Sequence, residues 1–466
     1  MNKTVLFYTI IALSLCGCAS VPHNFKPEKV DQHSALEEIN AEVIREAWQT
    51  QASPSFDVEI AWTDLGDPLL LGLIQRGLEN SLTLESALLS LRSAQISLKQ
   101  AEKEKSPFLS LGNGRASVSQ SRRGSPVDSY SFGGSASYRV DLWGLVDNNV
   151  TRSELGLADR ETALRAARID TARFIAQSYF DIRVQDEFIR LQEEQIDIQN
   201  RQLSLSKVRL EAGAITRLGV DQLSVNISSL ESTRENFKTL RANQVRSLAI
   251  LLGEAPQNFS LEPAPFVFWE VPRLKPTAPA QVIVQRPDIE RAERGVVSAG
   301  IALDSARKAW LPSLNFSAAA STGGLSIADL VSTDALAASV SAGLSVLLYS
   351  NGNRKRALEQ SEISKEQTLI SYERTLLGAL ESIERLLAQQ AENLRQGDLL
   401  VLRQEAQDRV TKITQVRYDT GAASAFDLIT EQNTALSVRR SRISTWLTGM
   451  RTSISMLGEL GVDPDI

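Results

Sequence analysis

Cysteine, histidine and methionine are nearly absent from this chain of 466 residues, which contains two, two and three of them. The two cysteines, Cys16 and Cys18, and both histidines, His23 and His33, lie near the N-terminus. The rest of the chain therefore lacks the residues for a disulfide framework, a thiolate or imidazole metal site, or a histidine-activated nucleophile. We expect no enzyme and no metal cofactor.

Long apolar runs are missing as well. Beyond the N-terminus, no stretch of about 18 apolar residues suits a transmembrane helix. The net charge of −6 argues against a nucleic-acid partner. A Gly-x-x-x-x-Gly-Lys-Ser/Thr loop for nucleotide phosphates is absent too. Hydrophobic residues nevertheless make up 42% of the chain, which fits a folded protein.

The N-terminus has the pattern of a secretory signal peptide. Lys3 precedes an apolar run over residues 5–15, which is too short to cross about 30 Å of hydrocarbon. The run ends in Leu-Cys-Gly-Cys at 15–18, which resembles the lipobox of bacterial lipoproteins. That resemblance implies cleavage before Cys18 and lipid on its thiol and amine, and Ala19 in the next position implies sorting to the outer membrane. The alternative is an ordinary signal peptide with two unrelated cysteines.

Most of the remaining chain is a tandem duplication with a period of about 206 residues. Val-Arg-Leu-Glu-Ala-Gly at 208–213 returns as Val-Arg-Tyr-Asp-Thr-Gly at 416–421, and other motifs return in the same order. We expect each copy to contain a helix, a β-hairpin, a very long helix, a tip and a returning helix. The expected division is a signal peptide at 1–17, an N-terminal segment at 18–75, the first repeat at 76–254, a proline-rich linker at 255–285, the second repeat at 286–460 and a tail at 461–466.

Residues 129–142 and 336–348 alternate apolar and small polar side chains, which predicts β-strands with two different faces. Each has a partner strand upstream, at about 108–121 and 313–321. A half-buried soluble sheet fits this pattern, but the signal peptide favours membrane strands. Four strands cannot close a membrane barrel, and an open edge is not viable in lipid. The chain should therefore oligomerise: two copies would give eight strands with a filled bore, and three would give twelve with a lumen.

Two heptad lines mark a proline-free helix over about 155–210. One line holds Ile175, Ile182, Ile189, Ile196, Leu203 and Leu210, and the other holds Val184, Leu191, Ile198 and Leu205. Lines displaced by two residues lie about 200° apart on a helix, so they predict a neighbour on each side, as in a closed ring. The second repeat has a similar pair, with Leu380, Leu387, Leu394 and Val401 on one line and Leu399, Ala406 and Ile413 on the other. A long soluble coiled coil would explain the heptads but not the strands.

In this order and spacing, the features resemble TolC-type outer-membrane efflux proteins of the acylated NodT subgroup. The resemblance covers essentially the whole mature chain, and its further motifs are Gln-Arg-Pro-Asp-Ile-Glu at 285–290, Trp-Leu-Pro-Ser-Leu at 310–314 and Asp-Leu-Trp-Gly at 141–144. It implies a mostly helical homotrimer. Twelve strands, four per chain, would form one outer-membrane β-barrel continued by a periplasmic α-helical barrel, with a belt formed by residues 18–75 and 255–285.

The resemblance also implies where the functional residues lie. Asp427, six residues after Gly421, matches the position at which related proteins narrow the tunnel with carboxylates, whereas the first repeat has Gly219 there. The alternative is that Asp427 only caps a helix. Arg417 and Tyr418 are expected to hold the closed tip, and the expected contacts with a periplasmic adaptor are Gly213, Ala214, Gly421 and Ala422.

The implied function is a passive outer-membrane exit duct for small molecules such as drugs or other toxic compounds. Its expected partners are a periplasmic adaptor (membrane fusion) protein, an inner-membrane pump of the resistance-nodulation-division type and outer-membrane lipid. The lipid on Cys18 is the only expected prosthetic group. Two alternatives remain: a duct for type I protein secretion and, in another class, a periplasmic coiled-coil lipoprotein without a pore.

Overall fold

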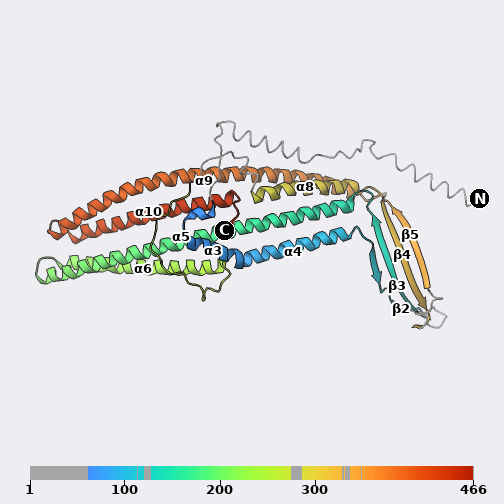
Figure 1. The fold of residues 1–466 in the computed structure, drawn as a ribbon, viewed down its shortest axis with the longest axis horizontal. Coiled ribbons are helices and arrows are strands. Elements are labelled where there is room, and N and C mark those ends of the chain that lie inside the picture. Colours follow the sequence, from blue (N-terminus) through green and yellow to red (C-terminus); the bar gives the residue numbers. More distant parts are fainter. Residues whose placement is uncertain are drawn as a thin grey trace, which may run out of the picture. The chain divides into compact units, whose positions relative to one another are not determined.

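The computed structural model describes residues 61–112, 114–119, 127–273, 286–327, 330, 336–347 and 349–464, all within one compact unit that spans residues 52–466. The predicted signal peptide, the predicted lipidation site Cys18 and most of the N-terminal segment lie outside the described residues. The described part is mostly helical and contains one antiparallel sheet at the end of the long helices (Figure 1).

The two halves of the chain contain the same elements. After a short 3-10 helix, η2 (Trp62–Leu65), and α3 (Pro68–Asn80), the first half comprises α4 (Leu82–Lys103), β1 (Phe108–Leu111), β2 (Arg115–Ser119), β3 (Val127–Val140), α5 (Leu145–Glu211) and α6 (Arg217–Leu251). The second half comprises α8 (Pro287–Lys308), β4 (Ser313–Gly324), β5 (Leu336–Ser345), α9 (Asn353–Asp419) and α10 (Ala425–Glu459). Corresponding helices have equal lengths: 22 residues in α4 and α8, 67 in α5 and α9, and 35 in α6 and α10.

The long helix α5 begins at Leu145, about ten residues earlier than its heptad pattern predicts. The Asp141 carboxylate accepts hydrogen bonds from the backbone N–H groups of Leu145, Val146 and Asp147, at 2.7, 3.0 and 2.9 Å. These N–H groups have no partner within the first turn, so Asp141 stabilises the helix start. The apolar stripe starts later than the helix, and periodicity alone therefore underestimates its length.

The Arg-Pro-Asp sequence at 286–288 starts α8. Pro287 lies in the first turn, the helix position that proline prefers. Arg286 is mostly buried and donates to Asp288 Oδ2 at 2.8 Å and to Glu459 Oε2 at 2.5 Å. The motif thus fastens the start of α8 to the end of α10. Its role in the described chain is structural.

The sheet joins the two halves in the order β1-β3-β4-β5, with β2 also pairing with β3, and every pair is antiparallel. The strand predicted at 108–121 is two strands separated at Gly112, whose φ of 110° favours glycine. The other three predicted strands are present as β3, β4 and β5. Because β3 pairs with β4 from Tyr130 opposite Gly324 to Val140 opposite Leu314, the two hairpins form one continuous sheet.

The strand register gives the sheet two chemically different faces, because residues paired across strands point to the same side. One face carries apolar side chains on every strand, including Leu109, Tyr130, Phe132, Val140, Leu314, Phe316, Val340 and Leu344. The other face carries serines that bond across strands, as in Ser110–Ser135 at 2.9 Å, Ser117–Ser129 at 2.8 Å and Ser313–Ser345 at 2.8 Å. This division suits lipid on one face and water on the other.

Helix α5 is the central helix of the described chain and packs against α3, α4, α6, α8 and α10. Its heptad lines are both buried in the region around Ile182 and Val184, at 0% and 1% exposure, which confirms neighbours on two sides. Helix α9 differs, since it packs mainly against α8 and α10. On α9, Leu399 and Ile413 of one heptad line are 65% and 61% exposed. The chain therefore presents an exposed apolar stripe along α9.

The main hydrophobic core lies where α3, α5, α6 and the C-terminal part of α10 meet. Its members include Trp62, Leu70, Ile175, Phe180, Leu248, Met450 and Ile454. The linker packs over it through Trp269, whose ring lies edge-on to Phe180 with centroids 5.7 Å apart. Burial of this apolar surface is the main stabilising contribution in the middle of the long helices.

A buried cluster of charges lies beside the core. The Asp186 carboxylate bonds Arg183 at 3.2 Å and also pairs with Arg241. The two arginines donate to the backbone oxygens of residues 262 and 261 at 2.9 and 2.6 Å, which ties the linker to α5 and α6. Tyr179 accepts from Arg183 and donates to Asp67, and burial together with the Asp67 bond raises the pKa of Tyr179 to about 12.

Candidate functional site: the tips of the helical hairpins

Both long helices end in the same backbone motif at the end of the molecule opposite the sheet (Figure 1). Gly213 and Gly421 have φ of 75° and 78°, a left-handed conformation that favours glycine. The N–H groups of Ala214 and Ala422 bond the carbonyls five residues back, at 2.8 and 2.7 Å, which closes a Schellman motif at each tip. All four residues are exposed, so both tips present a short, regular surface.

Asp427 lies in the first turn of α10 and takes part in a capping box. Its Oδ2 accepts from the N–H and the hydroxyl of Ser424, at 2.9 and 2.8 Å, and its own N–H donates to Ser424 Oγ at 3.2 Å. The bonds from Ser424, with a smaller contribution from Arg417, hold the pKa of Asp427 below its ordinary value. Because Asp427 is exposed, capping leaves this anionic group open to the space around the tip.

The first tip lacks a matching capping box. Thr216 precedes α6 and makes no side-chain capping bond, and Gly219 stands where the second repeat has Asp427. Asp221, two residues further on, lies 3.8 Å from Arg217 in an exposed pair. A Cβ on Gly219 would lie 3.9 Å from Ala425 Cβ, so the two tips are neighbours. Of the two corresponding helix-capping positions, 219 and 427, only the one at the second tip carries a carboxylate.

Tyr418 joins the two hairpins, whereas Arg417 stays within its own turn. The Tyr418 hydroxyl shares a hydrogen bond of 2.9 Å with Ser206 Oγ on α5, and the Arg209 guanidinium lies 5.4 Å from the tyrosine ring. Tyr418 is 8% exposed and Ser206 is fully buried. Arg417 Nη2 donates to the carbonyl of Ala422 at 3.4 Å. Tyr418 therefore stabilises the contact between the two hairpins, whereas Arg417 stabilises the turn after α9.

A row of glutamines continues the contact between the hairpins away from the tip. Gln199 and Gln195 on α5 donate to Gln432 Oε1 on α10, at 2.5 and 3.4 Å, and Gln202 donates to Gln415 Oε1 on α9 at 3.2 Å. We call these five residues the glutamine seam. The Oε1 atoms of Gln199 and Gln202 are buried without a protein hydrogen-bond partner. Amide pairing is directional but weak, so the seam can separate more easily than an apolar core.

A polar cavity of about 440 Å³ adjoins the seam between α5, α9 and α10. Its walls include Glu194, Lys412 and the ion pair of Arg439 with Asp408, at 3.2 Å. Both signs of charge are present, so no single ionic ligand is selected. A cavity with such walls can hold water that would solvate amides as they exchange partners. The glutamines recur at 192, 195, 199 and 202, a helical spacing of three and four residues by which they could have been found in the sequence.

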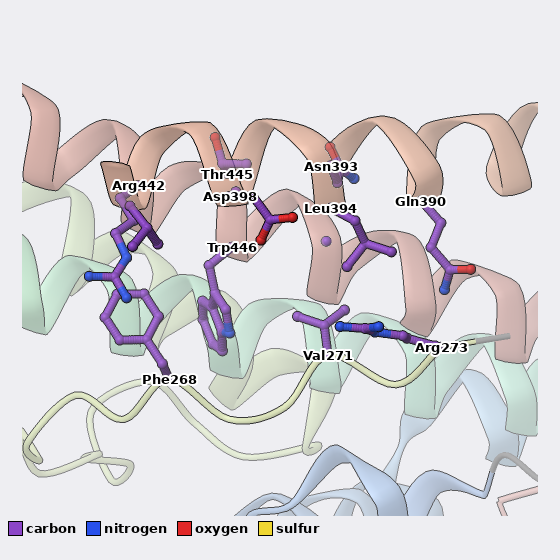
Figure 2. A pocket seen from close by; sticks show the side chains of 13 residues that line it. Phe268, Val271, Arg273, Gln390, Asn393, Leu394, Asp398, Arg442, Thr445 and Trp446 are labelled. Atoms are coloured by element: carbon purple, nitrogen blue, oxygen red, sulfur yellow. The ribbon is translucent and has the colours of Figure 1, made fainter. Parts of the chain in front are cut away.

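A second cavity, of about 190 Å³, lies where the linker crosses α9 and α10. Figure 2 shows Phe268 and Val271 of the linker facing Trp446, Leu394 and Arg442 of the helices. Arg442 lies 4.5 Å from the Phe268 ring, and Trp446 Nε1 donates to the carbonyl of residue 269 at 2.9 Å. These contacts hold the linker against the helices, and we assign the cavity to this packing.

Neither a metal site nor a membrane-spanning helix is present among the described residues. Among them, no group of three or more histidine, cysteine, aspartate or glutamate side chains is arranged to hold a metal ion. Within the described segments, no helix is both long enough and apolar enough to cross a membrane.

Comparison with known proteins identifies the family. The outer membrane efflux protein family matches residues 73–254 and 278–445. The pyoverdine export outer membrane protein OpmQ of Pseudomonas aeruginosa is 26% identical over 420 residues, which cover 88% of each chain. The probable efflux pump outer membrane protein TtgC of Pseudomonas putida is 24% identical over 479 residues, which cover 99% of this chain and 96% of TtgC.

Solved structures show the same fold. The crystal structure of CusC superimposes with a TM-score of 0.79 at 21% identity, covering 87% of this chain and 96% of CusC. The expected TolC-like architecture is thereby confirmed. The chain therefore belongs to the outer membrane efflux protein family, and it is an efflux channel of the outer membrane that extends into the periplasm, not an enzyme.

Proposed function

We propose that three copies of this chain form a passive exit duct for small molecules, which is closed at the periplasmic tips and opened by partner proteins. The observation that carries the proposal is that one chain leaves both edges of its described β-sheet without a neighbouring strand. Within the described residues, the sheet has an edge strand without a further neighbour on each side, β5 on one side and β1 with β2 on the other. Three chains joined edge to edge would close a sheet of twelve strand positions and satisfy the exposed backbone groups.

The helices support the same assembly. Leu399 and Ile413 on α9 form an exposed apolar stripe, and α4 exposes Leu82, Leu89 and Ile96 by 56% to 67%. Apolar stripes of this length on a helical hairpin are typical of surfaces that pack against another helix. In a ring, α9 of one chain would lie beside α4 or α6 of the next. Residues 18–75 and 255–285 would then form a belt around the helices, and lipid on Cys18 would anchor the N-terminus.

The tip surfaces and the relatives support a proposal for the partners and substrates. Exposed turns at Gly213, Ala214, Gly421 and Ala422 provide a periodic surface for the coiled-coil tips of a periplasmic adaptor. The adaptor would connect the duct to an inner-membrane pump of the resistance-nodulation-division type, which supplies the energy. The relatives are described as exporting pyoverdine, toluene or cations. This variety favours a duct whose substrate is chosen by the pump.

Trimer formation is expected to fail when the stripe on α9 is made charged. In the variant L399E/I413E, six carboxylates would be buried between chains without partners, so the trimer should dissociate or form in less than about a tenth of wild-type yield. Sedimentation and resistance of the trimer to SDS measure this. The matched variant L399M/I413V keeps the apolar surface and should assemble normally. An intact L399E/I413E trimer would mean that this stripe faces water.

Removal of the Asp427 charge is expected to reduce cation selectivity. Asp427→Asn keeps an oxygen acceptor for Ser424 but loses the charge, so the preference for K⁺ over Cl⁻ in single-channel recordings should fall by about threefold or more. Ser424→Ala, which removes a capping hydroxyl but keeps the charge, should retain the preference. Unchanged selectivity in Asp427→Asn would limit Asp427 to helix capping.

The pH dependence of this selectivity has a defined sign. Because the pKa of Asp427 is lowered by its bonds from Ser424, the carboxylate stays ionised from neutral pH down to about pH 5. Cation preference should persist over that range and be lost only as the pH falls through the lowered pKa. Three carboxylates close together would repel one another and raise the pKa. Loss of selectivity well above pH 5 would show that this repulsion dominates.

A further inference from the structure

The junction between the sheet and α9 carries a dense group of cations and aromatic residues. Arg354, Lys355 and Arg356 occupy the first turn of α9, Tyr349 lies just before it, and Trp310 precedes β4. Together these five residues form a patch at the periplasmic end of the sheet, which we call the junction patch.

The contacts within the junction patch leave most of its positive charge free to attract an anion. The Arg354 guanidinium lies 5.9 Å from the Trp310 ring and donates to the carbonyl of residue 347 at 3.3 Å. Lys355 is 77% exposed and faces Glu359 at 3.7 Å in a pair that is too exposed to neutralise it strongly. Arg356 donates to the carbonyl of Asn351 at 3.0 Å. Tyr349 and Trp310 are 80% and 49% exposed.

The equivalent junction of the first half is electrically balanced. Residues 99–107 and 137–151 hold four cationic and four acidic side chains, namely Lys99, Lys103, Lys105, Arg139, Glu102, Glu104, Asp141 and Asp147. The corresponding residues of the second half, 304–312 and 345–359, hold five cationic and two acidic ones, namely Arg307, Lys308, Arg354, Lys355, Arg356, Asp304 and Glu359. The excess of positive charge is therefore confined to one of two otherwise equivalent junctions.

The first turns of α5 and α9 also differ in charge, and the first turn of α9 is again the more positive. Asp141 neutralises the first turn of α5 through three backbone hydrogen bonds, whereas Tyr349 stands at its position in the second half. The first turn of α9 contains no acidic residue. The positive end of the α9 dipole thus adds to the three side-chain charges instead of being compensated.

The surroundings point to lipid as the source of a matching anion. The apolar face of the sheet continues to the junction through Leu344 and Val346, which are 70% and 50% exposed. Exposed tryptophan and tyrosine beside such a face are typical of the boundary between hydrocarbon and headgroups, and arginine and lysine at that depth attract anionic headgroups. We propose that the junction patch binds the phosphate groups of anionic phospholipids in the periplasmic leaflet of the outer membrane.

Lipid retention by the full-length protein tests this proposal. The purified protein in detergent is titrated with phosphatidylglycerol or with phosphatidylcholine, and bound lipid is counted by native mass spectrometry. Wild type should prefer phosphatidylglycerol, and R354Q/K355Q/R356Q should lose that preference by about tenfold or more. The preference should also weaken as salt rises from about 50 to about 500 mM.

Two control variants make the test specific. K99Q/K103Q/R152Q removes three exposed cations near the first junction and should bind lipid as wild type does. R354K/R356K keeps the charge and should retain the preference, provided that thermal unfolding shows all variants to be folded. Equal binding of the two lipids by wild type would overturn the proposal. So would an R354Q/K355Q/R356Q variant that changes ion selectivity in phosphatidylcholine bilayers but not lipid binding, because the patch would then line the channel.

Discussion

Replacing Tyr418 with phenylalanine is expected to raise the open probability of the channel by about a hundredfold. The Tyr418 hydroxyl is buried and shares its hydrogen bond with Ser206 of the other hairpin. Such a bond contributes about 1 kcal/mol, and three chains that open together would lose about 3 kcal/mol of stabilisation of the closed tip. Phenylalanine keeps the ring beside Arg209, so packing is retained. Single-channel recording measures the change directly.

Ser206 provides the internal control for this result. Ser206→Ala removes the other partner of the same bond and should raise the open probability to a similar degree. The combined variant S206A/Y418F should open little more than either single variant, because both changes remove one interaction. Additive effects would show that the two side chains act separately. A correctly assembled Tyr418→Phe trimer that stays as tightly closed as wild type would remove this bond from the closing mechanism.

Replacing Asp186 with alanine is expected to destabilise the fold by about 3 to 5 kcal/mol, because the buried Arg183 and the partly buried Arg241 would lose their shared carboxylate. The side chains of Asp186 and Arg183 are 4% and 3% exposed. The same arginines hold the linker through backbone oxygens, so the linker should loosen together with α5 and α6. Thermal or denaturant unfolding of the full-length protein measures the loss, and limited proteolysis in the linker reports its release.

Asp181 on the same helix is the matched comparison. It forms a bidentate pair with Arg451, at 3.0 and 2.6 Å, in which Arg451 is 48% exposed. Asp181→Ala should cost about 1 kcal/mol or less, since solvent can replace an exposed partner. Asp186→Asn keeps one acceptor oxygen but turns an amide NH₂ group toward the other arginine, so its loss should fall between those of Asp181→Ala and Asp186→Ala. Equal losses for Asp181→Ala and Asp186→Ala would show that burial does not control the energetics of this cluster.

Much of the architecture could be predicted from local patterns. Strand alternation and heptad spacing follow from backbone geometry, which repeats every two residues in strands and about every 3.6 in helices. The glycines at 213 and 421 follow from the left-handed turn that ends each long helix. They therefore appear in the sequence wherever the elements occur. Where another interaction sets an end, the pattern fails: the Asp141 cap moves the start of α5, and Gly112 divides the first strand.

Residues adjacent in sequence show why site roles were harder to predict. The sequence predicts one shared role for Arg417 and Tyr418 in holding the tip, but a rotation of about 100° per residue turns them to different sides of α9. Tyr418 reaches Ser206 on the other hairpin, and Arg417 bonds within its own turn. Asp427 has a capping role that is local and visible in the structure, whereas the proposed place at an aperture would depend on how three chains meet.

The repeat, the kinds of elements and their order can be derived from the amino-acid sequence alone, because each is encoded in short-range periodicity and in turn residues. Which faces meet is seen first in the folded chain: β3 pairs with β4 across the two repeats, the glutamine seam joins the hairpins, and Arg183 and Arg241 surround one carboxylate. These pairings join residues far apart in the chain. They are selected by the simultaneous burial of apolar surface and satisfaction of polar groups over the whole fold, which no local pattern records.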